Sequence, residues 1–551
     1  MTSKIIKNPI SIIFFSLFLF WPVKIIFAES VITSVIVGNS APSFTSAPYE
    51  TVASTTTSPT NVGSTVTFAA TGTDGNGDNY YLAICKTDAI SANNQAVPTC
   101  TGGNWCISTS TTSNSEASCG YGTLNGDAES NAWYAFVCDY STSSTCSASS
   151  QGSGDSGSPF EVNHSPSFPT INNNSPLDPG STMTWTTAVG VSDADTGDTV
   201  KLLICKTTGV SGSSCDGGAS DTWCSSDLGS SSPTCEIGIS IPTVDTSYDA
   251  YAYVFDMHNF AAGGANQGVG TSYVVNNVAP VISAISVNGG SNITLNEGDT
   301  APAVLGATIT DNNGCGDLST ITSDLYRSGV GNSNCDTGGD ANNNNCYPAL
   351  SCSIAGGNTC DGATDPSASY QCTANLKYYA DPTDSNTTYD GQTWKDTFHA
   401  VDNNSASDNL EIGSGVVLNS LLAMDIGSSL AYGNVAVGET IDPLSKLTII
   451  TSTGNVGLDQ ELSGVDMDDG NEHYIAVGYQ KYGLSASTAY AVGTTLTISA
   501  TESELNCAKT TSDTGSTKPT FWGISIPQGT FAGTYSGTNT VTAIKGEYAQ
   551  W

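Results

Sequence analysis

The chain has 551 residues, and its 51 Asp and Glu against 14 Lys and Arg give a net charge of -37. This excess of negative charge repels phosphate backbones, and Arg327 is the single arginine, so nucleic-acid binding is excluded. Only 12% of the residues are charged and 58 are glycine, which disfavours long helices. At about 100–200 residues per domain, the length predicts several domains.

The first 28 residues have the pattern of a secretory signal peptide. Lys4 and Lys7 precede an apolar run from residue 10 to 23, and Ala28 precedes a polar residue. An uncleaved membrane anchor is the alternative, but Lys24 interrupts the run before the ~20 residues that span a bilayer. No later apolar run has that length. We therefore expect cleavage near Ala28, no membrane span in the mature chain, and an extracellular or cell-surface location.

The 17 cysteines fall into three even-numbered sets and one remaining residue, Cys507. An exported chain with such sets is expected to form disulfides within each set. Zinc is the alternative, but the paired C-x-x-C spacing of zinc sites is missing. Cys507 is expected to be a buried thiol or an intermolecular link. The three sets are Cys85, Cys100, Cys106, Cys119, Cys138 and Cys146; Cys205, Cys215, Cys224 and Cys235; and Cys315, Cys335, Cys346, Cys352, Cys360 and Cys372.

Internal repeats divide the chain. "YYLAICKT" at 80–87 matches "VKLLICKT" at 200–207, and "WYAFVCD" at 133–139 matches "AYAYVFD" at 250–256, with a more divergent copy, "WKDTFHAVD", at 394–402. The second copy lacks counterparts of both Cys138 and Cys146, which predicts that these two cysteines are bonded to each other. The other four cysteines of each of the first two units allow three connectivities.

The joints between units also repeat. Each ends in proline, at Pro42, Pro166 and Pro280, with asparagine three residues earlier. Proline restricts the preceding residue to extended geometry, so short, stiff connectors are expected. The predicted organisation is a signal peptide at 1–28, a strand or linker at 29–41, β-sandwich domains at 42–163, 164–278 and 279–415, and a fourth β-sandwich, without disulfides, at 416–551.

Short β-rich runs separated by Gly, Asn, Asp, Ser and Pro predict the fold class. Examples are residues 64–70, 251–255 and 304–310. The expected fold is all-β, with tandem antiparallel β-sandwich domains that form an elongated rod. Aromatic residues on the strand at 133–139 and its copy are expected to pack in the sandwich core, and a carbohydrate-stacking platform is the alternative.

Several motifs resemble a known kind of protein. "ATGTDGNGDNYYLAIC" (70–85), "SDADTGDTVKLLIC" (192–205), "YYADPTD" (378–384) and "PQGTFAGTYSGTNTVTA" (527–543) are similar to tandem immunoglobulin-like or cadherin-like domains of bacterial and archaeal surface proteins, including exported proteins of uncultured small-celled bacteria. The resemblance implies a structural, adhesive or recognition role at the cell surface and carries no catalytic residues.

Acid-rich turns recur before an apolar strand in each unit, and an acid also ends each aromatic strand. Oxygen ligands spaced two or three residues apart on a glycine-rich turn can bind Ca²⁺, and the cadherin-like resemblance implies the same. An ordinary turn is the alternative, because Asp, Asn and Gly favour turns. The predicted weak, structural calcium ligands are Asp74, Asn76, Asp78 and Asp139; Asp193, Asp195, Asp198 and Asp256; and Asp311, Asn313, Asp317 and Asp402.

No enzyme is predicted. The four histidines are scattered, and neither H-E-x-x-H nor G-x-S-x-G occurs. The expected function is that of a non-enzymatic cell-surface or envelope structural or adhesion protein, with other surface proteins, glycans or copies of itself as partners. The alternatives are a carbohydrate-binding array, which exposed Trp133, Trp394 or Trp522 would favour; a self-assembling filament or surface-layer subunit; and a secreted hydrolase.

Residues 31–37, "VITSVIV", have the composition of a strand, and the segments before the later joints close the preceding sandwich. Three alternatives remain open for this segment. It joins a sheet of the first domain, it is donated to another subunit, or it is a disordered leader.

Overall fold

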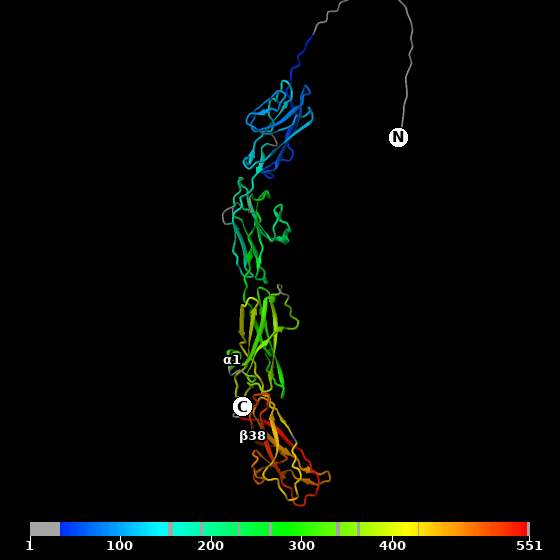
Figure 1. The fold of residues 1–551 in the computed structure, drawn as a ribbon, viewed down its shortest axis with the longest axis vertical. Helices are drawn as coiled ribbons and strands as arrows, with labels where there is room; N and C mark the ends of the chain where they lie inside the picture. Colours follow the sequence, from blue (N-terminus) through cyan, green and yellow to red (C-terminus); the bar gives the residue numbers. More distant parts are fainter. Residues whose placement is uncertain are drawn as a thin grey trace, which may run out of the picture. The chain divides into compact units, whose positions relative to one another are not determined.

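A computed structural model describes residues 33–152, 158–187, 191–229, 232–263, 267–337, 342–360, 364–427 and 429–547 (Figure 1). The predicted signal peptide lies outside these residues. The chain divides into two compact units, residues 1–163 and 164–551. In both units antiparallel strands form facing sheets, so the predicted all-β fold of tandem antiparallel sandwiches is confirmed. The predicted domain boundaries stay predictions.

The first unit contains one sandwich. Its sheets have the orders β1-β3-β8, β10-β4-β7 and β2-β11-β9, beside the hairpin β5-β6. All six residues of β4 are buried, because Leu82 and Ile84 face the core while Ala83 and Cys85 pack under a second apolar cluster. A strand covered on both faces reads as a continuous apolar run, as "YYLAIC" does. The strands are β1 Ser43–Glu50, β2 Thr60–Asn61, β3 Thr65–Thr73, β4 Tyr80–Cys85, β5 Ile90–Ser91, β6 Thr99–Cys100, β7 Asn104–Ile107, β8 Glu116–Gly122, β9 Ser130–Asn131, β10 Tyr134–Asp139 and β11 Phe160–Asn163.

The second unit begins with a sandwich of related topology, called here the second sandwich, at residues 164–278. Its sheets are β12-β13-β18 and β17-β14-β20-β21, with the hairpin β15-β16 and the two-stranded sheet β19-β22. Trp185 and Tyr273 are buried in its core. Its elements are β12 Ile171–Asn173, β13 Thr182–Thr187, β14 Val200–Cys205, β15 Val210–Ser211, β16 Ser214–Cys215, the 3-10 helix η1 Gly218–Asp221, β17 Thr222–Ser225, β18 Thr234–Gly238, β19 Ser247–Tyr248, β20 Tyr251–Asp256, β21 Val269–Gly270 and β22 Tyr273–Val274.

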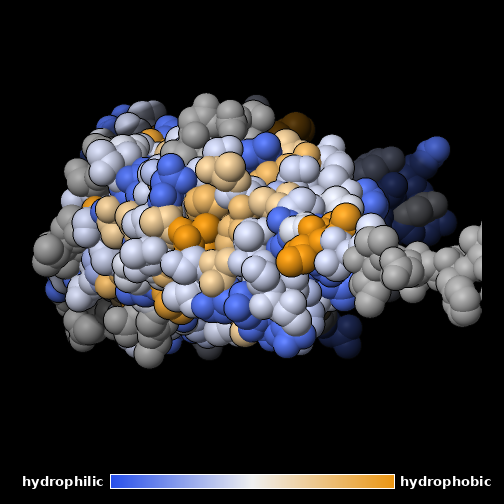
Figure 2. All heavy atoms as spheres, turned by 90° about the horizontal axis from the view of Figure 1, so that it is seen from above, coloured by the Kyte–Doolittle hydropathy of each residue, from blue (hydrophilic) through white to orange (hydrophobic). Residues whose placement is uncertain are grey.

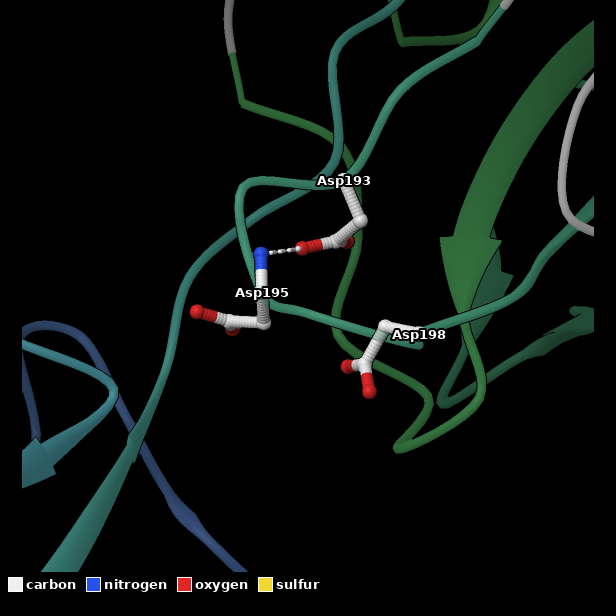
Figure 3. Close-up of side chains that lie close together, drawn as sticks. All are labelled: Asp193, Asp195 and Asp198. Carbon is white, nitrogen blue, oxygen red and sulfur yellow. Dashed lines mark hydrogen bonds between the residues drawn. The ribbon is translucent and has the colours of Figure 1, made fainter.

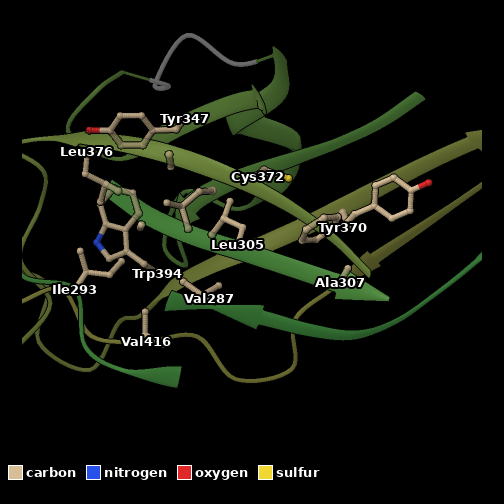
Figure 4. Packing of buried hydrophobic residues seen from close by; sticks show 14 of the residues in the cluster. Val287, Ile293, Leu305, Ala307, Tyr347, Tyr370, Cys372, Leu376, Trp394 and Val416 are labelled. Carbon is tan, nitrogen blue, oxygen red and sulfur yellow. The ribbon is translucent and has the colours of Figure 1, made fainter. Parts of the chain in front are cut away.

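The third sandwich pairs the sheet β23-β24-β28-β27 with the sheet β26-β25-β29-β30. Trp394 lies in its core beside Leu376 and Ile293 (Figure 4). Val416 bridges to Trp394 and Leu418 to Ile293, so its pairing extends past the predicted boundary at residue 415. The elements are β23 Val281–Val287, η2 Asn288–Gly290, β24 Thr300–Thr310, η3 Cys315–Asp317, β25 Leu318–Arg327, α1 Asn332–Thr337, β26 Cys346–Ser351, β27 Ser353–Ile354, β28 Ser367–Lys377, β29 Trp394–Asp402 and β30 Ser407–Glu411.

The fourth sandwich pairs the sheet β31-β32-β39-β36-β37 with the sheet β38-β33-β40, beside the hairpin β34-β35. Trp522 and Leu462 are buried between the sheets. Its elements are β31 Met424–Ile426, β32 Lys446–Ser452, β33 Leu458–Gly464, β34 Met467–Asp468, β35 Tyr474–Ile475, η5 Val477–Tyr479, β36 Gln480–Gly483, η6 Tyr490–Val492, β37 Thr494–Thr495, β38 Thr501–Cys507, β39 Thr517–Ile524 and β40 Asn539–Lys545.

Eight disulfides form, each within one of the three predicted sets. The predicted Cys138–Cys146 bond is among them. Cys507 is a buried free thiol, so an intermolecular link through this residue is wrong. The other bonds are Cys85–Cys100, Cys106–Cys119, Cys205–Cys215, Cys224–Cys235, Cys315–Cys360, Cys335–Cys346 and Cys352–Cys372.

The segment before the first sandwich is not paired. Residues 33–42 contain no strand, and the side chains of Val35, Ile36 and Val37 are 82%, 95% and 75% exposed. The alternative in which this segment joins a sheet of the first domain is therefore wrong for residues 33–37; residues 31 and 32 lie outside the described part. On the face seen in Figure 2, hydrophobic residues gather toward the middle among more hydrophilic ones. None of the described helices is long and apolar enough to cross a membrane.

Candidate metal centres at the acidic turns

Each acid-rich turn connects two strands that lie in opposite sheets. The turns follow β3, β13 and β24 and precede β4, β14 and β25. In each, Oδ1 of the first aspartate accepts a hydrogen bond from the backbone N–H two residues later, an Asx-turn that fixes the loop. The donor–acceptor distances are 2.7 Å from Asn76 to Asp74, 2.9 Å from Asp195 to Asp193 and 2.8 Å from Asn313 to Asp311.

The joints are fastened to these turns. The backbone N–H that follows the joint asparagine donates to the third residue of the turn. The distances are 2.7 Å from Ser40 to Asn76, 2.6 Å from His164 to Asp195 and 2.7 Å from Val278 to Asn313. The repeated joint motif and the repeated acidic motif are therefore two parts of one structure.

The turn of the third sandwich forms the most complete oxygen cluster. Asp311, Asp317 and Asp402 each offer a carboxylate oxygen, and these atoms lie within 4.8 Å of one another. Asp311 and Asp402 are 0% and 2% exposed. Oδ2 of Asp311, Oδ2 of Asp317 and Oδ1 of Asn277 are buried and accept no hydrogen bond. Buried acceptors without donors are costly, so this cluster is suited to a cation.

The second sandwich contributes to the same cluster. The Asn313 amide donates to the backbone oxygens of Thr243 at 3.1 Å and Asn276 at 2.9 Å. The Asn404 amide donates to the Asp245 carboxylate. Asp245 thus adds a fourth negative charge to the cluster, from the loop between β18 and β19. The cluster therefore lies where the second and third sandwiches meet.

The electrostatics of this cluster favour a bound cation. Burial, opposed by the hydrogen bond from Asn313, raises the pKa of Asp311 to about 6, and the charges of Asp317, Asp402 and Asp245 add to the effect. The pKa of Asp317 is raised as well, first by burial and then by Asp245. No salt bridge to Lys, Arg or His involves these four carboxylates within the described ranges. Carboxylate and amide oxygens are the ligands that Ca²⁺ prefers.

The corresponding group in the second sandwich consists of Asp193, Asp195 and Asp198, whose carboxylates project from one turn (Figure 3). Oδ2 of Asp193 is buried without a hydrogen bond, and burial raises the pKa of Asp193 to about 6, assisted by the neighbouring acids. Two histidines lie beside this group. His164 Nδ1 is 2.7 Å from Asp195, and His258 Nε2 is 3.6 Å from Asp198.

Asp256 does not belong to that group of three, although its charge acts on Asp193. Its Oδ1 accepts backbone hydrogen bonds from His258 and Phe260, both at 2.8 Å. Asp256 therefore stabilises the turn after β20. The two histidines were not predicted as site residues, although each lies within two residues of a joint asparagine or a predicted aspartate.

The first sandwich does not gather its acids. Asp74, Asp78 and Asp139, all described, do not form a group of three carboxylates within 4.8 Å. Asp139 instead accepts hydrogen bonds from the Thr145 backbone, at 2.6 Å, and from the Asn39 side chain. Asp74 Oδ2 is nevertheless buried without a hydrogen bond. Equivalent calcium sites were predicted in all three units. Among the predicted ligands that the structure describes, three carboxylates come together only in the second and third units.

A further acidic group lies in the fourth sandwich and was not predicted. Asp459, Glu504 and Glu547 come within 4.8 Å of one another, and both glutamates are exposed. The charges of Glu547 and Asp459 raise the pKa of Glu504. No spacing in the sequence indicates this group, because the pairing of β33 with β38 and β40 brings its members together.

Trp133, Trp394 and Trp522 do not form a binding face. Trp133, Trp394 and Trp522 are 0%, 0% and 1% exposed. Solvent exposure of these three residues would have favoured a carbohydrate-binding array, and all three are buried. Phe136 and Tyr253 on the aromatic strands are each 5% exposed and pack in apolar clusters, in agreement with the expected core role.

Comparison with known proteins adds little. No family model matches the chain, and no curated protein matches it. Among solved structures, the mouse nectin-like molecule 4 ectodomain is 11% identical, with 66% of this chain and 96% of that chain covered at a TM-score of 0.27. Extracellular cadherin domains 3–6 of protocadherin gamma B2 are 11% identical, with 90% and 99% covered at 0.24. TM-scores this low support no inference about this chain.

Proton competition gives the first prediction. Because the raised pKa values belong to the metal-free fold, protonated Asp193 and Asp311 stabilise that fold at low pH, and this contribution is lost as pH rises through about 6. Calcium requires the ionised carboxylates, so its affinity should fall as pH drops below about 6. As the pH falls from about 7 to about 5, the unfolding temperature measured in chelator should rise. The increase in unfolding temperature that calcium causes should become smaller over the same range.

Thermal unfolding at several pH values, with calcium and with chelator, checks this. The effect of calcium is taken as the difference between the two at each pH, so that other titrating groups cancel. A calcium increment that is unchanged or larger at the lower pH would contradict the prediction.

Proposed function

We propose that this chain is an exported, non-enzymatic structural or adhesive protein of the cell surface. In this proposal its immunoglobulin-like sandwiches are braced internally by disulfides, and calcium fixes the junction between the second and third. Eight disulfides within the modules support an oxidising, extracellular location, since such bonds are rare in reducing compartments. Its partners would be other surface proteins, glycans or further copies of the chain.

One observation carries the proposal about the junction. Asp311, Asp317, Asp402 and Asp245 gather four carboxylates from two consecutive sandwiches, and buried acceptor oxygens among them lack donors. In calcium, these carboxylates would attract one another through the ion. Without it, they repel. The same residues thus set the stiffness of the junction according to the calcium concentration.

The histidines support a non-enzymatic role. Each of the four lies beside an aspartate, in the pairs His164–Asp195, His258–Asp198, His399–Asp324 and His473–Asp469. Two of these aspartates belong to the acidic turn of the second sandwich, and Asp469 lies four residues before His473 in a local turn. A carboxylate beside a histidine orients the ring and stabilises its charge, so these pairs require no catalytic role.

Calcium titration of the full exported chain tests the proposal. With a Kd of about 10⁻⁴–10⁻³ M, a few millimolar calcium should add about 1–2 kcal/mol per site to the free energy of unfolding. The double variant Asp311→Asn and Asp317→Asn should lose that increment and the corresponding heat of binding in calorimetry.

The matched control changes two charges in the exposed group of the fourth sandwich, Glu504→Gln and Glu547→Gln, and should keep the calcium response. Absence of binding heat and of thermal stabilisation in the unaltered chain, at calcium concentrations around 10⁻² M, would refute calcium at this junction.

A further inference from the structure

The fourth sandwich differs from the other three in its last strand. Each of the first three has a closing segment that runs parallel to an early segment of the same sandwich. The paired residues are Val162 with Thr60, Val275 with Leu177 and Leu418 with Ile293. The closing segments also pair antiparallel with an earlier strand of the same sandwich. β11 pairs with β9, β22 with β19, and β30 with β29, the strand directly before it.

In the fourth sandwich, β40 takes the position that β29 has in the third. It lies beside β33 in the order β38-β33-β40, as β29 lies beside β25 in the order β26-β25-β29-β30. No strand of the described residues pairs with the other edge of residues 539–544. An exposed strand edge offers backbone donors and acceptors for one more strand.

The core under β40 is also less completely covered than the cores of the other three sandwiches. Val541 and Ala543 face the core of the fourth sandwich but are only partly buried. Their counterparts on the strands of the first three sandwiches are 0% exposed: Ala135 and Val137, Ala252 and Val254, and Phe398 and Ala400. A closing strand would cover the side chains that remain partly open here.

The segment before the first sandwich has the sequence of such a strand. Val35, Ile36 and Val37 precede Asn39 just as Tyr273, Val274 and Val275 precede Asn277. In the second sandwich, Tyr273 and Val275 point inward and are 2% and 1% exposed, while Val274 between them is 43% exposed. In the first sandwich the inward Phe160 and Val162, 0% and 1% exposed, lie one residue nearer to the joint asparagine, and Glu161 between them is also buried. By the alignment with the second sandwich, Val35 and Val37 would point inward.

We infer that residues 33–38 of one copy of this chain add as one more strand along the open edge of β40 in a second copy. Val35 and Val37 then cover Val541 and Ala543, and Ile36 faces outward. Backbone hydrogen bonds supply affinity, and the inward side chains set the register. Donor and acceptor are different surfaces, so each added copy leaves one of each free. The contact is head-to-tail and builds an open chain of subunits.

Sedimentation velocity of the full exported chain over a range of concentrations tests this inference. The unaltered chain should assemble, and the double variant Val35→Asp and Val37→Asp should be monomeric. These residues are exposed in the single chain, so the variant should keep its unfolding temperature. The matched control is Ile36→Glu, since the corresponding residue of the second sandwich, Val274, is 43% exposed; it should assemble like the unaltered chain.

A peptide of residues 31–40 locates the acceptor. It should bind the monomeric double variant and slow hydrogen exchange in residues 539–545, and the peptide carrying both aspartates should bind at least about tenfold more weakly. A monomeric unaltered chain that does not bind the peptide, loss of assembly in Ile36→Glu, or protection of a different edge would each overturn the inference. Calcium binding is measured separately, so either proposal can fail without the other.

Discussion

Replacing Asp381 by alanine should destabilise the third and fourth sandwiches by about 3–5 kcal/mol, because it leaves two buried cations without their shared counter-ion. The Asp381 carboxylate receives Arg327 Nε at 3.0 Å and Lys509 Nζ at 3.1 Å. All three side chains are at most 9% exposed. Burial lowers the pKa of Lys509, and Asp381 opposes this effect. Lys509 comes from the fourth sandwich and the other two residues from the third, so the loss should affect both.

Chemical denaturation of the full chain measures this loss. The matched control is Asp513→Ala. Asp513 also joins these two sandwiches, through Lys377 at 2.9 Å, but it is 68% exposed. An exposed pair contributes at most about 1 kcal/mol, so the control should change little. Equal losses in the two variants would show that burial does not set the strength of the Asp381 contacts.

Repetition made much of the fold predictable. The matched segments at 80–87 and 200–207 became β4 and β14, central strands of their sheets. The absence of Cys138 and Cys146 together in the second copy predicted their bond, which forms. The sequence could not choose among the remaining connectivities, because the cysteines of one unit all lie on nearby strands and loops. Only the folded register shows which pairs of cysteines can meet.

The candidate site was predictable as turns but not as clusters. Spacing identified Asp193, Asp195 and Asp198, which share one loop and lie together. It did not identify Asp245, since this residue reaches the third sandwich from a neighbouring one. Nor did it show that Asp74, Asp78 and Asp139 of the first unit do not gather into such a group. Contacts between modules do not follow from local spacing.

Removing the Cys315–Cys360 bond is the second change expected to have a large effect. The two cysteines are 45 residues apart in the sequence, and a loop of that length corresponds to about 4 kcal/mol of stabilisation through the entropy of the unfolded chain. Cys315 also lies within the acidic loop, between Asp311 and Asp317. The backbone N–H groups of Asp311 and Cys315 bind the oxygens of Pro366 and Asp365, both at 2.7 Å. The Cys315–Cys360 bond therefore holds the acidic loop against the segment around Asp365 and Pro366.

The double variant Cys315→Ser and Cys360→Ser should thus lose stability and also bind calcium more weakly, because the loop no longer holds its carboxylates in place. The matched control is the double serine variant of Cys335 and Cys346, in the same sandwich. That bond closes 11 residues, so its removal should cost about 3 kcal/mol. It lies beside Tyr326, away from the acidic loop, and should leave calcium affinity unchanged. Unfolding in denaturant and calcium titration of both variants separate the two effects. If both variants lost calcium affinity equally, general loosening of the sandwich would explain the result better than the position of Cys315.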